Sequence, residues 1–446
     1  MQFGYAMYHN KNSFKINEDR SHHELQTTDS LSSQALRPLG LYIHFPYCSQ
    51  RCPYCDFTLT TTAVPHEDYL QACLNELDLR QQELDQYAWS KRPLTSLYFG
   101  GGTPSLWSPQ CLKAFIDHCA QVFGFHTDIE ITIEANPAEV TLPLLHAWSE
   151  LGINRISLGV QSMRINTLKR LGRDHSPEQV KQVVEWIRLS QIKQFSVDLI
   201  HGLSGEGVNE ALEDLEAVLA LSPQHISLYQ LTIEEKTSFG LRTARGEKLL
   251  EPDETLIDIY RALSQRLEQE GMSLYEVSNA SLPNHEAKHN SLYWTMADYI
   301  GIGTGAHGRI IINESEHEPQ FGLRWQNIRL PQKYIEHCLT GLNPLTKLDA
   351  KRLSVGQKIN MIEEERGHID QEGLNEEAIM VGLRLKRGLS LTPELINRYG
   401  KHAQKLTQKG LLTHSPACSE HPWGRWQSTE RGRELLDHLC YKLILG

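Results

Sequence analysis

Short apolar runs alternate with amphipathic stretches along most of the chain after residue 40. The runs are rich in β-branched and aromatic residues and predict six strands, at Leu41–Phe45, Leu97–Phe99, Ile129–Ile133, Arg155–Leu158, Phe195–Leu199 and Ile226–Tyr229. Helices are predicted between them, because apolar residues recur three and four positions apart, as at Leu212, Leu215, Val218 and Leu219. This alternation favours an α/β fold of parallel βα units, wrapped into an open sheet or a partial barrel. Residues that follow the strands would then gather at one rim, where ligands bind.

The same patterning divides the chain into four segments. Residues 1–37 are polar and without period, which is typical of a disordered tail, and residues 38–275 hold the βα units. Residues 276–348 contain a glycine-rich stretch around Tyr299–Ile312. Residues 349–446 are helical and end in short segments that resemble a small hairpin, so we expect a mainly helical, winged-helix-like terminal domain.

Composition narrows the class of protein but not its chemistry. The 446 residues include 44 Lys and Arg against 55 Asp and Glu, a net charge of −11, which argues against non-specific nucleic-acid binding. The chain has no run of about 18 apolar residues, and its first 40 residues lack the apolar core of a signal peptide. We therefore expect a cytoplasmic protein with at most peripheral membrane association and no nucleic-acid partner.

Three of the nine cysteines lie close together, at Cys48, Cys52 and Cys55, on a loop after the first predicted strand. The spacing C-x3-C-x2-C can place three thiolates on three irons of a [4Fe–4S] cluster and leave the fourth iron open. An alternative is zinc, with His44 as the fourth ligand. The other six cysteines are scattered and are predicted to be buried in the reduced state.

Several polar or glycine-rich motifs follow the other predicted strands. Gly100-Gly101-Gly102-Thr103-Pro104 comes after the second strand, and Glu134 ends the third. Gln161 closes the fourth strand, and Arg173 follows in a glycine turn. Alone, the glycine run is more typical of a tight strand–helix turn, and a residue such as Glu134 is more often a solvated loop acid. Asp198 is the most informative, because a carboxylate within an apolar strand is costly unless it is paired or bound.

These motifs together resemble radical S-adenosylmethionine (SAM) proteins, from about Leu41 to Gly308. The aromatic Tyr54 before the third cysteine is part of that signature. The resemblance implies a partial (β/α)6 barrel, a [4Fe–4S] cluster and SAM, whose amino and carboxylate groups chelate the open iron. An electron from the cluster can cleave SAM to a 5′-deoxyadenosyl radical in that family. The match is best to the branch that contains oxygen-independent coproporphyrinogen III oxidase and HemW-type haem chaperones.

The resemblance also implies site residues. The cluster ligands would be the three clustered cysteines. Contacts to the cluster-bound SAM would be made by Tyr42, Gly101 and Glu134. Contacts to a second SAM molecule, as in the oxidases, would be made by Tyr54, Gly102, Thr103, Gln161, Arg173 and Asp198.

Two features separate the oxidases from the chaperones. Phe57 stands where the oxidase pattern has a fourth cysteine. The segment from His289 to Trp294 reads H-N-x-x-Y-W and resembles the haem-binding motif of the chaperones. His289 would ligate iron, Asn290 would orient its imidazole, and Tyr293 and Trp294 would supply flat surface and donors for propionates. Alternatively, Tyr293 and Trp294 are core and His289 is a loop residue. Other iron ligands also remain open, including His285 and His307.

We therefore expect a haem chaperone that binds haem, transfers it to acceptor apo-haemoproteins and carries a [4Fe–4S] cluster with exchangeable SAM. This reading favours a binding protein over an enzyme and assigns no catalytic residue. An electron donor would be a further partner if radical chemistry occurs. The alternative is a coproporphyrinogen III oxidase or another radical SAM enzyme.

Overall fold

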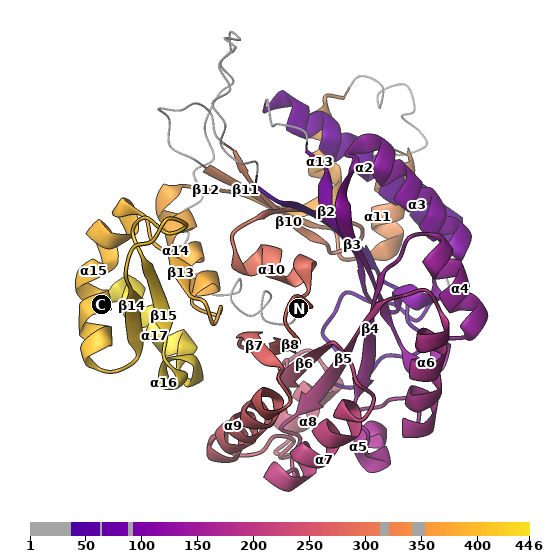
Figure 1. Cartoon of the computed structure of the whole chain (residues 1–446). Helices are drawn as coiled ribbons and strands as arrows, with labels where there is room; N and C mark the ends of the chain where they lie inside the picture. The colour runs from indigo at the N-terminus through magenta and orange to yellow at the C-terminus, as the bar shows by residue number, and fades with distance from the viewer. Residues whose placement is uncertain (1–36, 63–64, 88–91, 313–320, 341–352) are drawn as a thin grey trace.

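A computed structural model of the chain describes residues 37–62, 65–87, 92–312, 321–340 and 353–446 (Figure 1). Six parallel strands follow one another in a curved sheet and contain all six predicted strands. They are β1 (Leu39–Phe45), β2 (Leu94–Gly101), β3 (Phe125–Ala135), β4 (Arg155–Gln161), β5 (Gln194–His201) and β6 (His225–Gln230). This arrangement confirms the α/β fold with a partial barrel of parallel strands. Of the expected tail at residues 1–37, all but Arg37 lies outside the described residues.

Helices cover the convex face of this sheet (Figure 1). They are α2 (His66–Gln86), α3 (Pro109–Val122), α4 (Leu142–Glu150), α5 (Ile165–Arg170), α6 (Pro177–Leu189), α7 (Val208–Leu219), α8 (Ser238–Ala244) and α9 (Asp253–Gln269). Ser108, Thr141 and Ser176 cap α3, α4 and α6 with side chains that accept backbone N–H groups. The apolar faces of most of these helices and the outward side chains of the strands form one continuous core.

Further strands extend the sheet at both edges. On the β1 side, β9 (Asp298–Ile302) pairs parallel to β1, and β10 (His307–Ile312), β11 (Phe321–Asn327) and β12 (Glu363–Ile369) follow antiparallel. On the β6 side lie β8 (Asn279–Ser281) and β7 (Ser273–Glu276). Two helices, α11 (Pro331–Thr340) and α13 (Val355–Ile362), pack against α2. The glycine-rich stretch therefore continues the main sheet.

The helix α10 (Lys288–Trp294) lies on the concave side of the sheet, opposite the outer helices (Figure 1). It packs against β1, β2 and β9. Glu130 on β3 accepts the backbone N–H groups of Lys288 and His289 at 3.0 and 3.1 Å, which satisfies the helix N-terminus. Gly40 permits the close approach, because a Cβ there would lie 2.4 Å from Leu292.

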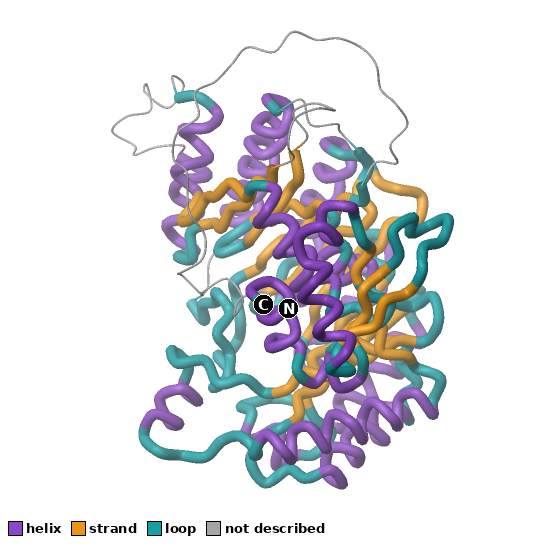
Figure 2. Tube along the Cα trace, turned by 90° about the vertical axis from the view of Figure 1, so that its left-hand side faces the viewer, coloured by secondary structure: helices purple, strands orange, loops and turns teal. Residues whose placement is uncertain are grey.

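The C-terminal unit has its own apolar cluster. Its elements are α14 (Gln371–Gly382), β13 (Leu389–Ser390), α15 (Pro393–Gln408), β14 (Leu412–Ser415), β15 (Arg425–Ser428), α16 (Glu430–Glu434) and α17 (Leu436–Leu445). Its small sheet has the order β13-β15-β14, which gives the expected mainly helical, winged-helix-like part. Figure 2 views the molecule from this side, with the helices of the unit in front of the main sheet. The α14 helix contacts α10 across the opening of the barrel.

The cysteines outside the loop at residues 48–55 are mostly buried. As predicted, this holds for Cys73, Cys111, Cys119, Cys338 and Cys440, whereas Cys418 is exposed, because it lies in the connection between β14 and β15.

Within the described ranges, every helix is too short or too polar to cross a lipid bilayer.

Candidate functional site

The cysteine loop follows β1 at the carboxyl ends of the parallel strands. It is held by backbone hydrogen bonds from Cys48 N to Thr60 O (3.1 Å) and from Cys55 N to Cys52 O (3.2 Å). All three cysteines are half-buried and line one pocket. That pocket also contains every residue expected to contact SAM except Tyr42.

Neighbouring donors point at two of the sulfur atoms. Thr103 Oγ1 donates to Cys48 Sγ at 3.3 Å, and Arg173 Nη1 donates to Cys52 Sγ at 3.5 Å. Burial raises the pKa of the Cys48 thiol, and it raises the pKa of Cys55 to about 12. In the absence of a metal, burial therefore favours the neutral thiol at Cys48 and Cys55.

The donor set fits a cluster better than a single zinc ion. A cubane spreads three thiolates over three irons. Among the described residues, no group of three or more His, Cys, Asp or Glu is arranged to hold one metal ion. His44, the fourth ligand in the zinc alternative, uses both ring nitrogens, Nδ1 with the Tyr42 hydroxyl at 2.9 Å and Nε2 with the Thr58 carbonyl at 2.6 Å.

The glycine run has a packing reason of its own. Gly101 has φ +115°, and a Cβ there would lie 2.6 Å from the His44 ring. Gly102 N donates to Phe45 O at 2.7 Å, and a Cβ at Gly102 would meet Tyr47 O at 2.7 Å. These two glycines let β2 end against the entrance to the cysteine loop, and they also line the pocket.

Glu134 ends β3 on the pocket wall. It accepts from the Gly101 backbone N–H and from the Tyr98 hydroxyl, both at 2.9 Å. Burial raises its pKa to about 7, although these two donors work in the opposite direction. The carboxyl group is therefore poised to change charge near neutral pH when a cation arrives beside it.

The remaining predicted SAM residues meet on β4, β5 and the turn after α5. Gln161 adopts φ +67° at a bulge in β4, a strained conformation that is common at functional sites. Arg173 Nη2 donates to Asn136 Oδ1 at 2.8 Å and to Gly159 O at 3.0 Å. Ser157 Oγ donates to the Asp198 carboxylate at 3.3 Å, and burial raises the pKa of Asp198.

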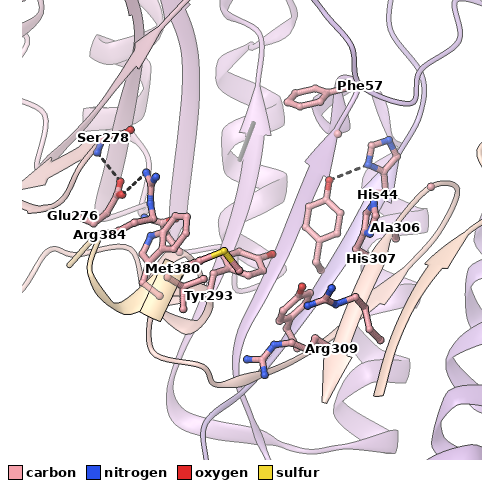
Figure 3. A pocket seen from close by; sticks show the side chains of 18 of the residues that line it. His44, Phe57, Glu276, Ser278, Tyr293, Ala306, His307, Arg309, Met380 and Arg384 are labelled. Atoms are coloured by element: carbon pink, nitrogen blue, oxygen red, sulfur yellow. Dashed lines mark hydrogen bonds and ion pairs between the residues drawn. The ribbon is translucent and has the colours of Figure 1, made fainter. Parts of the chain in front are cut away.

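A second cavity opens between α10, the strands β9 to β11 and α14 (Figure 3). Tyr42 lines this cavity and not the cysteine pocket. The two spaces adjoin, because Phe57, Gly101, Glu134 and Tyr229 line both of them. Phe57 thus stands at their junction.

Three residues of the H-N-x-x-Y-W motif line the second cavity, namely Asn290, Tyr293 and Trp294. Their spacing of three and four positions puts them on one face of α10. Asn290 Nδ2 donates to the Tyr275 hydroxyl at 2.9 Å, so this amide does not orient the His289 imidazole as expected. Tyr293 packs edge-on against Tyr299 with ring centres 4.7 Å apart.

His289 does not line the cavity, because its ring is buried one turn before Tyr293, against β2. It is 0% exposed, and its ring stacks on Tyr98 at 4.9 Å. Its Nδ1 is 2.8 Å from Ser96 Oγ and its Nε2 is 2.9 Å from the Tyr293 hydroxyl. Burial lowers the pKa of His289 to about 3, so the ring is neutral. Ligation of iron by His289 would require Tyr293 to give up this bond, and it stays a prediction.

The cavity contains residues that the sequence patterns did not single out. Arg309 on β10 and Arg324 on β11 both pair with Glu377 of α14, at 3.4 and 3.2 Å. Arg384 pairs with Glu276 at 3.0 Å and lies 4.4 Å from the centre of the Trp294 ring. No sequence pattern around Arg384 predicts its place in the cavity, because the C-terminal unit meets α10 only in the folded protein. His285, weighed above as an iron ligand, does not line the cavity, whereas His307 does.

Comparisons with known proteins bear on this arrangement. The sequence model of the radical SAM superfamily matches residues 42–218. The heme chaperone HemW of Escherichia coli K12 is 41% identical over 278 residues, which cover 62% of this chain and 71% of the relative. The heme chaperone HemW of Lactococcus lactis subsp. lactis is 30% identical over 420 residues, which cover 92% of this chain and 98% of the relative.

A solved structure extends the likeness to the whole fold. Coproporphyrinogen III oxidase (HemN) from Escherichia coli, a radical SAM enzyme, superposes on this chain with a TM-score of 0.70. The superposition covers 92% of this chain and 91% of the oxidase chain. At 20% identity this likeness concerns the fold alone. The sequence relatives are closer, and the chain belongs to the family of the heme chaperone HemW within the radical SAM superfamily.

Proposed function

We propose that this protein binds haem in the cavity between α10 and α14 and delivers it to acceptor apo-haemoproteins. The observation that carries the proposal is the wall of that cavity, where flat aromatic surface from Tyr293 and Trp294 meets Arg309, Arg324 and Arg384. Haem needs apolar surface for its macrocycle and cationic donors for its two propionates. The name of the relatives, heme chaperone, agrees with this assignment.

Two buried donors support an acidic ligand. In the described part of the chain, Arg309 Nη1 and Trp294 Nε1 are buried without a hydrogen-bond partner. A buried donor without an acceptor costs free energy, and a bound carboxylate would remove that cost. Arginine is suited to the role, because its planar fork binds carboxylates with two parallel hydrogen bonds.

Phe57 is the residue that favours a chaperone over the oxidase. It lines both spaces, so the position between the SAM pocket and the haem cavity offers an apolar ring and no thiol. Conversion of coproporphyrinogen to protoporphyrinogen by reduced, anaerobic protein would establish the oxidase alternative instead.

The cysteine pocket is the proposed site of a [4Fe–4S] cluster held by Cys48, Cys52 and Cys55, with SAM on the open iron. A bound cluster would supply one-electron chemistry toward SAM. Glu134 and the backbone at Gly101 would hold the SAM molecule at the cluster. Gly102, Thr103, Gln161, Arg173 and Asp198, together with Tyr54, line the rest of the pocket, where a second molecule would lie. Tyr42 would act from the cavity side, through its hydrogen bond to His44.

The affinity for SAM should depend on pH through Glu134. The SAM ammonium needs a carboxylate partner, and the pKa of Glu134 is about 7 before SAM binds. Below that pH the group is neutral and must lose a proton on binding, so affinity should rise between pH 6 and 8 and then level off. Equilibrium dialysis with the reconstituted protein measures this. Glu134→Gln should bind more weakly and without the pH step; a step that persists in that variant would exclude Glu134 as its source.

Haem titration tests the main proposal. The purified protein should bind about one haem per chain, and Trp294→Ala should weaken binding by about tenfold through loss of stacked surface. Trp423, which is 52% exposed on the C-terminal hairpin, provides the matched control, because Trp423→Ala removes the same side chain away from the cavity. Equal affinities of the two variants would place haem elsewhere. Transfer of the bound haem to an apo-haemoprotein, followed by absorbance, tests delivery.

A further inference from the structure

The cavity wall carries two histidines within the described chain, His44 and His307. An imidazole that ligates iron uses one ring nitrogen and donates the N–H of the other to a nearby acceptor. His44 already uses both nitrogens, with Tyr42 and Thr58. If His44 ligated iron, it would have to give up one of these two bonds, and the bond to Thr58 holds the segment after Cys55.

His307 has the partner expected of a ligating histidine. It begins β10 opposite Gln326 of β11. The Gln326 amide satisfies its neighbours when its oxygen accepts from His307 Nε2 at 3.2 Å and from Arg329 Nη2 at 3.0 Å. With the proton fixed on Nε2, the lone pair of the neutral ring is on Nδ1. The amide thus sets the tautomer that a ligand through Nδ1 requires.

The backbone before His307 is held in place by its neighbours. Gly305 N donates to Ile328 O and Asn327 N donates to Ala306 O, both at 2.9 Å. Gly305 has φ +67°, and a Cβ there would lie 2.6 Å from Thr58 Oγ1. This turn is therefore wedged between β11 and the segment after the cysteine loop, and a fixed backbone is what a metal ligand needs.

The opposite wall suits the face of a macrocycle. Figure 3 shows His307 on one side of the cavity and Met380 beside Tyr293 on the other. Met380 belongs to α14 and Tyr293 to α10. A flat ligand between these walls would have His307 toward one face and apolar surface toward the other.

We infer that His307 is the axial ligand of the haem iron in this cavity, and that His289 is a positioning residue that holds Tyr293 against the macrocycle. The inference rests on the proposed haem-binding function. The H-N-x-x-Y-W motif alone would place the iron ligand at His289.

The test compares haem with iron-free protoporphyrin IX in the full-length protein. His307→Ala should weaken haem binding roughly tenfold or more and remove the absorbance and electron paramagnetic resonance signature of histidine ligation. Added imidazole should restore that signature. The affinity for iron-free protoporphyrin should stay as in the wild type, because no axial bond is lost and the pocket remains intact.

The outcomes are distinct. A histidine signature that survives in His307→Ala, or an equal loss of affinity for both porphyrins, would overturn the inference. His289→Ala should weaken both porphyrins alike and keep the histidine signature; loss of that signature there would make His289 the ligand. If the wild-type protein binds neither porphyrin, the proposed function itself fails.

Discussion

Cys52→Ser is expected to remove nearly all iron and acid-labile sulfide from anaerobically purified protein. A [4Fe–4S] cluster with three protein ligands has no spare thiolate, and serine does not replace one. Cys52 also receives a hydrogen bond from Arg173, which is half-buried, so the substitution removes the sulfur partner of this cation. Iron and sulfide analysis, together with the visible absorption of the cluster, measures the effect.

Cys418→Ser is the matched control for this experiment. Cys418 is exposed and lies on the C-terminal hairpin connection, so the substitution should leave iron and sulfide at wild-type levels. Full iron and sulfide in Cys52→Ser would remove this residue from the ligand set. Wild-type protein that contains zinc and no sulfide would replace the cluster by the zinc alternative.

Arg80→Met is expected to destabilise the folded protein by about 3–5 kcal/mol, because it leaves buried carboxylates without their cation. Arg80 is 1% exposed and contacts Glu76 at 3.3 Å, Glu83 at 3.3 Å and Glu363 at 2.5 Å. Its guanidinium also lies 4.4 Å from the centre of the Trp325 ring. The effect is measured by urea denaturation at neutral pH.

The variant should also change the pH dependence of stability. Burial raises the pKa of Glu76 even with Arg80 present, and removal of the cation should raise it further. A carboxyl group whose pKa rises on folding destabilises the native state as pH increases, so the penalty in Arg80→Met should shrink as the pH falls. Arg242→Met breaks an exposed pair with Glu247 and should leave stability unchanged. A similar loss in both variants would show that the buried network is not the cause.

This network also bears on the haem cavity. Glu76 Oε2 accepts the backbone N–H of Gly303 at 2.9 Å, and Asn327 Nδ2 donates to Gly303 O at 2.8 Å. The turn that leads to His307 is therefore anchored to α2 through the same buried charges.

Residue patterns along the chain were sufficient to predict the parallel strands of the barrel and the rim where the cysteine loop lies. Strand and helix periodicity is local, and parallel strands bring the residues at their carboxyl ends to one rim whatever their separation along the chain. For this reason Cys48 and Glu134 were expected at one rim, the family resemblance added Asp198 to the same site, and the structure brings all three to a single pocket. The motif from His289 to Trp294 was identified by its resemblance to the haem-binding motif of the chaperones.

The orientation of that motif depends on contacts with other parts of the folded chain. His289 and Tyr293 lie one turn apart on the same side of α10, and the burial of His289 against the sheet depends on Gly40, Ser96 and Glu130, which lie on strands of that sheet. Arg384 and Met380 line the cavity only in the folded protein, because α14 meets α10 after the C-terminal unit packs against the barrel, and Arg309 and Arg324 reach the same cavity from β10 and β11. Burial and partner choice depend on contacts between distant segments, and no periodicity within one segment records them.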